Sequence, residues 1–185
     1  VATDYRIISD AARQANLAQP LADLGGAGSV TRRDGTGWNT FEVQTAYTPT
    51  EGDFGNGQHA LVLGLHRNQY QLENVVNNAS DWRSTETTQN QSYYGKTTIT
   101  ALYAQDAWKL HPDWMLTTGL RFENFESLDG SQYFAGPPVA QSSFPGRSLT
   151  ALSPKLSLAW GATDDVVIKT SLGRGVRFPN VDELF

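Results

Sequence analysis

A two-residue alternation of apolar and polar side chains begins near residue 40 and continues through most of the chain. Six segments carry this alternation: 40–49, 59–70, 98–110, 114–126, 151–162 and 166–177. In the fourth segment, Leu116 and Leu120 alternate with Thr117 and Arg121. A period of two indicates a strand whose two faces meet different surroundings. The sequence therefore predicts an all-β, antiparallel protein.

The lengths of the segments and of their connections favour a membrane barrel. The segments are long for soluble strands, which average about 5–6 residues, and match the roughly 9–11 residues that cross a bilayer at a tilt. Short connections at 50–58, 111–113 and 163–165 alternate with long ones at 71–97 and 127–150. Tight turns at one rim and long extracellular loops at the other are typical of outer-membrane barrels. We therefore expect extracellular loops at 71–97 and 127–150.

Composition agrees with this interpretation. Hydrophobic residues make up 39% of the chain and no run approaches the roughly 18 apolar residues of a membrane-spanning helix. Four aromatic residues lie beside short turns, where an aromatic girdle would be expected: Tyr47, Trp108, Trp114 and Trp160. The net charge of -5 argues against a nucleic-acid partner.

The predicted strands are too few to close a barrel. Residues 1–38 are irregular and are expected to form an extracellular loop with one short strand around Tyr5–Ser9, while 39–185 hold six antiparallel strands. Six or seven strands leave an open edge, which cannot face lipid. The last residues do not alternate, and Pro179 would break strand pairing. We expect an incomplete segment of a larger transmembrane barrel.

Four stretches, in this order and spacing, resemble the barrel of TonB-dependent outer-membrane receptors. They are LYAQDAW at 102–108, LTTGLRFE at 116–123, SPKLSL at 153–158 and GRGVRFPNVDELF at 173–185. The resemblance implies a barrel of about 22 strands in the outer membrane of a Gram-negative bacterium, with an N-terminal plug. It also implies uptake of a scarce small-molecule ligand, such as a ferric siderophore, cobalamin or a glycan, with energy supplied through TonB. The plug and the TonB contact would lie in a missing N-terminal part.

Two sets of residues are candidates for contact with the ligand or the plug. Cations predicted to face the barrel interior could pair with plug carboxylates or steer an anionic ligand; they are Arg121, Lys155, Lys169 and Arg177. Aromatic residues of the first long loop suit a recognition surface; they are Trp82, Tyr93 and Tyr94.

Metal binding and catalysis find little support. His59 and His66 are seven positions apart on one predicted strand, so they face opposite ways, and His111 lies in a turn. Carboxylate pairs do not converge as acid–base catalysis requires. We expect no cofactor, no metal site and no enzyme activity. The rival interpretations are a passive porin or adhesin-like barrel and a soluble β-sandwich that binds a ligand.

Overall fold

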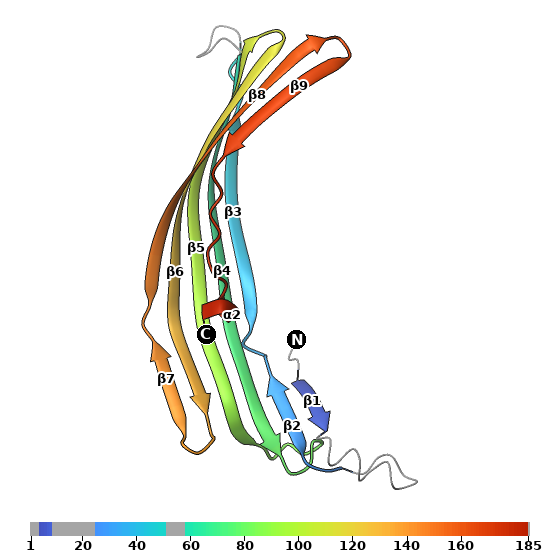
Figure 1. The fold of residues 1–185 in the computed structure, drawn as a ribbon, viewed down its shortest axis with the longest axis vertical. Coiled ribbons are helices and arrows are strands. Elements are labelled where there is room, and N and C mark those ends of the chain that lie inside the picture. The colour runs from blue at the N-terminus through green and yellow to red at the C-terminus, as the bar shows by residue number, and fades with distance from the viewer. Residues whose placement is uncertain (1–3, 9–24, 51–57, 185) are drawn as a thin grey trace.

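The computed structural model describes residues 4–8, 25–50 and 58–184, which form one curved antiparallel sheet (Figure 1). Its strands are β1 (Asp4–Ile8), β2 (Gly28–Arg32), β3 (Gly37–Tyr47), β4 (His59–Ala79), β5 (Thr88–His111), β6 (Trp114–Phe134), β7 (Ala140–Phe144), β8 (Arg147–Thr163) and β9 (Val166–Gly173). One short helix, α2 (Val181–Leu184), follows β9. In the described part of the chain, no helix is long and apolar enough to cross a membrane.

The strand order is β1-β2-β4-β5-β6-β8-β9, with β3 on β4 and β7 on β6. β2 and β3 pair with successive parts of β4, and β7 and β8 pair with successive parts of β6. Each couple is therefore one interrupted strand. Where β2 and β3 separate, Thr36 Oγ1 donates to Glu73 O at 2.7 Å. Seven antiparallel barrel strands result, and the predicted all-β, unclosed architecture is confirmed.

The strands are longer than the alternation predicted. Residues 71–79 and 88–97 continue β4 and β5, and residues 127–134 continue β6, so the connecting tips are only 80–87 and 135–139. The predicted loops over 71–97 and 127–150 are thus largely strand, and the region 1–38 contains β1 and β2. A strand segment that meets polar surroundings on both faces loses the apolar alternation, as expected if these extensions project beyond a bilayer. The extracellular location of the tips stays a prediction.

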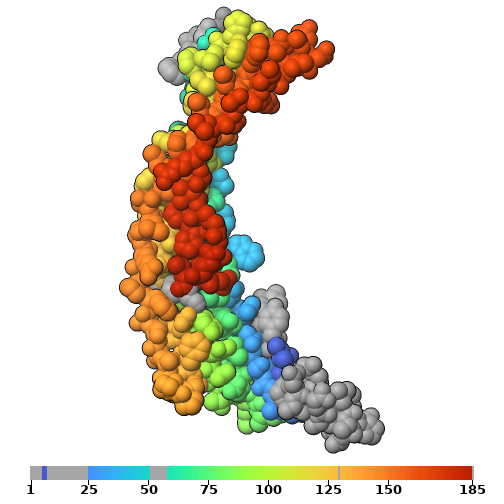
Figure 2. All heavy atoms as spheres, in the orientation of Figure 1, coloured from blue at the N-terminus to red at the C-terminus, as the bar shows by residue number. Residues whose placement is uncertain are grey.

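The register gives the sheet two chemically different faces. Residues directly opposite each other on antiparallel strands share a face, and Leu65, Leu102 and Phe122 form one such row. Leu102 is 61% exposed, as expected of a side chain turned away from any core. The row continues to Leu152 on β8, and farther along the sheet Leu156 of β8 lies opposite Leu172 of β9, which makes an apolar outer face. The concave face carries the polar set and the segment after β9, whose atoms run along the hollow in Figure 2.

A glycine makes room for an aromatic ring on the concave face. Gly64 lies opposite Tyr103, and a Cβ built on Gly64 would lie 2.1 Å from Tyr103 Cζ. The ring of Tyr103 therefore fills the space that the missing side chain leaves. Its hydroxyl donates a hydrogen bond to Glu42 Oε1 on β3 at 2.6 Å, so the ring links β5 to a strand beyond its direct neighbour.

Gly64→Ala should destabilise the folded protein by about 1–3 kcal/mol, because the new methyl group displaces Tyr103 and breaks its bond to Glu42. The measurement is the thermal unfolding midpoint of the purified full-length protein. Gly119→Ala is the matched control, since a Cβ there meets nothing closer than 3.6 Å. Equal midpoints for the two variants would contradict the packing role of Gly64.

Candidate functional site

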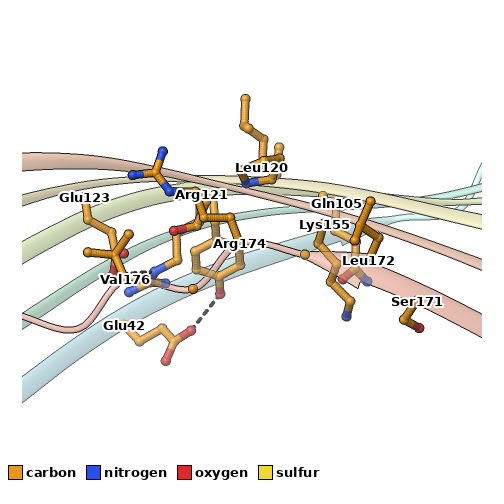
Figure 3. Close-up of a pocket in the computed structure, with 17 residues that line it drawn as sticks. Glu42, Gln105, Leu120, Arg121, Glu123, Lys155, Ser171, Leu172, Arg174 and Val176 are labelled. Carbon is orange, nitrogen blue, oxygen red and sulfur yellow. Dashed lines mark hydrogen bonds and ion pairs between the residues drawn. The ribbon is translucent and has the colours of Figure 1, made fainter.

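A recess of about 700 Å³ lies on the concave face, bounded by β3, β5, β6, β8, β9 and the segment after β9 (Figure 3). We call it the inner recess. Its charged and hydrogen-bonding residues come from separate strands that the register brings together: Glu42, Tyr103, Gln105, Arg121, Glu123, Ser153, Lys155, Ser171 and Arg174. Leu120 points to the opposite side of the sheet from Glu42 and Lys155 in Figure 3, which agrees with the two-faced register.

A chain of polar contacts crosses one end of the inner recess. Glu42 accepts the bond from Tyr103, and its other carboxylate oxygen lies 3.6 Å from His66 Nδ1. Arg121 Nε donates to Glu123 Oε1 at 2.8 Å, and its guanidinium lies 5.7 Å from the centre of the Tyr103 ring. These four strands are therefore joined by side chains as well as by their backbones.

Two cations complete the recess. Lys155 stands on β8, and Arg174 follows β9, where its backbone N–H donates to Pro154 O at 3.0 Å. Neither forms an ion pair with any residue that the structure describes. With Arg121 the recess holds three cationic side chains against the two carboxylates of Glu42 and Glu123. Its formal charge is thus one positive unit, although the whole chain is acidic.

The residues after β9 form a strap, 174–184, that lies on the concave face (Figure 1). Phe178 stacks on Phe125 of β6, with ring centroids 5.1 Å apart and planes 5° from parallel. Val181 of α2 is fully buried, and α2 packs against β4 and β5. Apolar contact therefore holds the strap to the inner wall.

Hydrogen bonds fix the shape of the strap end. The Asn180 side chain accepts from Glu183 N at 2.9 Å, and the Glu183 carboxylate accepts from Asn180 N at 3.1 Å. This reciprocal arrangement is a capping box. Arg177 also donates to the Glu183 carboxylate. Arg177, Asn180 and Glu183 thus stabilise one local structure at the end of the strap.

A smaller recess of about 260 Å³ lies beneath α2. Its lining combines an arginine, a carboxylate, an amide and two tyrosines with smaller neighbours: Arg33, Thr36, Tyr70, Leu72, Asn74, Tyr93 and Asp182. Arg33 Nε donates to Asn74 Oδ1 at 3.4 Å. The strap therefore closes one side of a polar hollow on the inner wall.

The predicted cations do not form one cluster. Arg121 and Lys155 line the inner recess, whereas Arg177 pairs with Glu183 in the strap. Lys169 lies on the concave face nearer the short turns, opposite Ala159 and outside the recess. Sequence reasoning missed Arg174, whose position depends on the strap turning back against β8.

The three predicted aromatic residues also lie in different parts of the structure. Tyr93 faces inward and lines the smaller recess, while Tyr94 takes the opposite face. Trp82 lies in the β4–β5 tip, where its backbone N–H donates to Gly26 O at 2.8 Å. Arg6 donates to the backbone oxygen of Trp82 at 3.1 Å. Trp82 thereby joins the tip to the β1–β2 region, and its role in recognition stays a prediction.

An ion pair also stabilises this tip. Hydrogen bonds from the Arg83 side chain, and then from its backbone N–H, hold the pKa of the Asp81 carboxyl below its ordinary value. A lowered folded-state pKa stabilises the tip above the pKa of an unfolded aspartate, and this contribution is lost as the pH falls through the folded value.

Among the described ranges, no group of three or more histidine, cysteine or acidic residues could hold a metal ion.

An apolar outer face opposite an ionic inner face defines the wall of an outer-membrane β-barrel. A family model described as "TonB dependent receptor-like, beta-barrel" matches residues 2–185. The chain belongs to this family, which confirms the resemblance, and its place is the outer membrane of a Gram-negative bacterium. The family comprises receptors and transporters, not enzymes. Comparison with curated proteins and with solved structures gave no match.

Glu183→Ala should loosen the strap end, because it removes the capping carboxylate and the partner of Arg177. A lost cap costs about 1 kcal/mol, which corresponds to about fivefold faster hydrogen exchange for the amides of 180–184 in the full-length receptor. Asp182→Ala is the control, since Asp182 is exposed in the same turn and outside the capping box. Equal exchange in the two variants would show that the capping box does not hold the strap.

Proposed function

We propose that this chain forms part of the barrel of a receptor that imports an anionic small molecule, such as a ferric siderophore, with energy supplied through TonB. Membership of the receptor family supports the transport role. The observation that carries the ligand class is the inner recess, where Lys155 and Arg174 stand without an ion-pair partner among the described residues. An anion entering this part of the barrel would meet two available cations.

The surroundings favour these two cations over Arg121 and Arg177 as ligand contacts. Arg121 and Arg177 already donate to Glu123 and Glu183, so an incoming anion would have to displace an existing partner. Lys155 and Arg174 need no such exchange. A positively charged recess in an acidic protein also concentrates anions locally. Pairing of the same cations with carboxylates of a plug is the second role for which they are suited.

The test of the transport role is growth and uptake in the native host. Deletion of the complete gene should abolish accumulation of one class of iron-labelled hydroxamate, catecholate or carboxylate chelate, and loss of TonB should have the same effect. A passive porin or adhesin predicts accumulation that is independent of TonB. Uptake of every chelate at the normal, TonB-dependent rate in the deletion strain would refute the ferric siderophore as ligand.

The ligand contact itself predicts a charge effect. Lys155→Glu combined with Arg174→Glu in the full-length receptor should weaken binding of the transported anion at least tenfold, about 1.4 kcal/mol, because attraction becomes repulsion. Surface binding of labelled ligand without energy measures this affinity. Lys169→Glu is the matched control, since Lys169 faces inward but lies outside the inner recess. Equal affinity for both variants, with normal folding, would exclude the recess as the contact.

A further inference from the structure

One ionisable pair interrupts the apolar outer face. The outward row of β5 reads Leu102, Ala104, Asp106 and Trp108. The carboxylate of Asp106 lies 2.8 Å from Nδ1 of His59, which stands opposite Trp108 on β4. The His59 ring stacks on the indole of Trp108 at 5.2 Å. A carboxylate on a lipid-facing surface is costly unless it has partners, so this position calls for a physical explanation.

His59 contacts only one of the two carboxylate oxygens of Asp106. Oδ2 of Asp106 contacts the imidazole, whereas Oδ1 is buried and accepts no hydrogen bond from any residue of the described ranges. A buried acceptor without a donor is unfavourable. The Asp106 side chain as a whole is 25% exposed, so a donor at the outer face can reach the carboxylate through its exposed part but not at the enclosed Oδ1, and a positively charged donor would offset its charge most effectively.

A groove leads to this carboxylate along the outer face. The recess has a volume of about 320 Å³, and its outward-facing lining is Leu61, Leu63, Ala104, Asp106, Thr118 and Leu120. Ala104 lies between Leu63 and Leu120 in the strand register, and Thr118 lies opposite Asp106, so these two small side chains form its floor. Five of these six residues offer an apolar or methyl-bearing surface, and only Asp106 carries charge. We call this hollow the outer groove.

We propose that the outer groove binds one phospholipid with a primary ammonium headgroup, as in phosphatidylethanolamine. An acyl chain lies against Leu61, Leu63 and Leu120, and the ammonium donates a hydrogen bond to the Asp106 carboxylate. Charge complementarity selects this headgroup: a choline headgroup carries the charge but has no N–H to donate, and a glycerol headgroup lacks the positive charge. No residue of the inner recess takes part.

The position along the strand suits a headgroup contact. Asp106 is two residues from Trp108, roughly 7 Å along the strand. Trp108 is one of the aromatic residues that lie beside the short turns. Aromatic girdles mark the depth at which headgroups meet hydrocarbon. Asp106 therefore lies just inside that depth, where an ammonium that bends toward the protein contacts the carboxylate while the acyl chain extends along the outer groove toward the bilayer centre.

The experiment compares lipids that remain bound to the full-length receptor. The purified protein is exchanged into an equimolar mixture of phosphatidylethanolamine, phosphatidylcholine and phosphatidylglycerol with identical acyl chains, and bound lipid is counted by native mass spectrometry. The unaltered receptor should retain phosphatidylethanolamine at least threefold over each of the others. Asp106→Asn should bring the three lipids to equal retention, because the amide lacks the charge.

Further variants separate lipid binding from a merely structural ion pair. His59→Gln keeps the carboxylate and should keep the preference, whereas Ala104→Leu fills the groove floor and should lower retention of all three lipids without removing the charge. Asp164→Asn, in an exposed short turn, is the matched control and should behave as the unaltered protein. The proposal fails if Asp106→Asn keeps the preference, or if Ala104→Leu retains as much lipid as the unaltered receptor.

Discussion

The antiparallel register of β4, β5 and β6 decides which way the side chains of this protein face. Leu63, Ala104 and Leu120 are directly opposed and turn outward, while the next row places Tyr103 opposite Arg121 on the inner face. A shift of one residue would exchange the two rows, turning leucines inward and the arginine toward lipid. The apolar belt and the ionic wall are therefore two results of one hydrogen-bonded ladder.

The inner wall combines fixed charges with available ones. Glu42 of β3, Tyr103 of β5, and Arg121 and Glu123 of β6 are tied to one another, so their positions are held by mutual contacts. The strap adds a second layer, anchored by an aromatic stack and a buried valine. Such a wall offers a ligand or a plug a surface that is largely preformed, which lowers the entropic cost of association.

A charged side chain has a different energetic cost on the two faces of the sheet. A charged group that points into a wet barrel keeps its hydration, so the inner cations need no special account. On the outer face an unpaired carboxylate would meet hydrocarbon, where the cost of burial is high. Asp106 therefore needs partners at this position. The imidazole of His59, the outer groove and the indole of Trp108 are the features on which the proposed lipid site rests.

Alternation determined the fold class and the sidedness of each strand, because a period of two is a local property of neighbouring residues, and the lengths of the segments and of their connections indicated the membrane setting. The same reasoning placed Arg121 and Lys155 inside and separated His59 from His66. The sequence did not place Arg174 beside Lys155, because that contact depends on the strap folding back against β8. The lengths of β4 to β6 also needed the structure, since the apolar signal ends where the bilayer ends while the backbone ladder continues. Pairing between distant strands, which local pattern does not encode, decided the composition of both recesses on the inner wall.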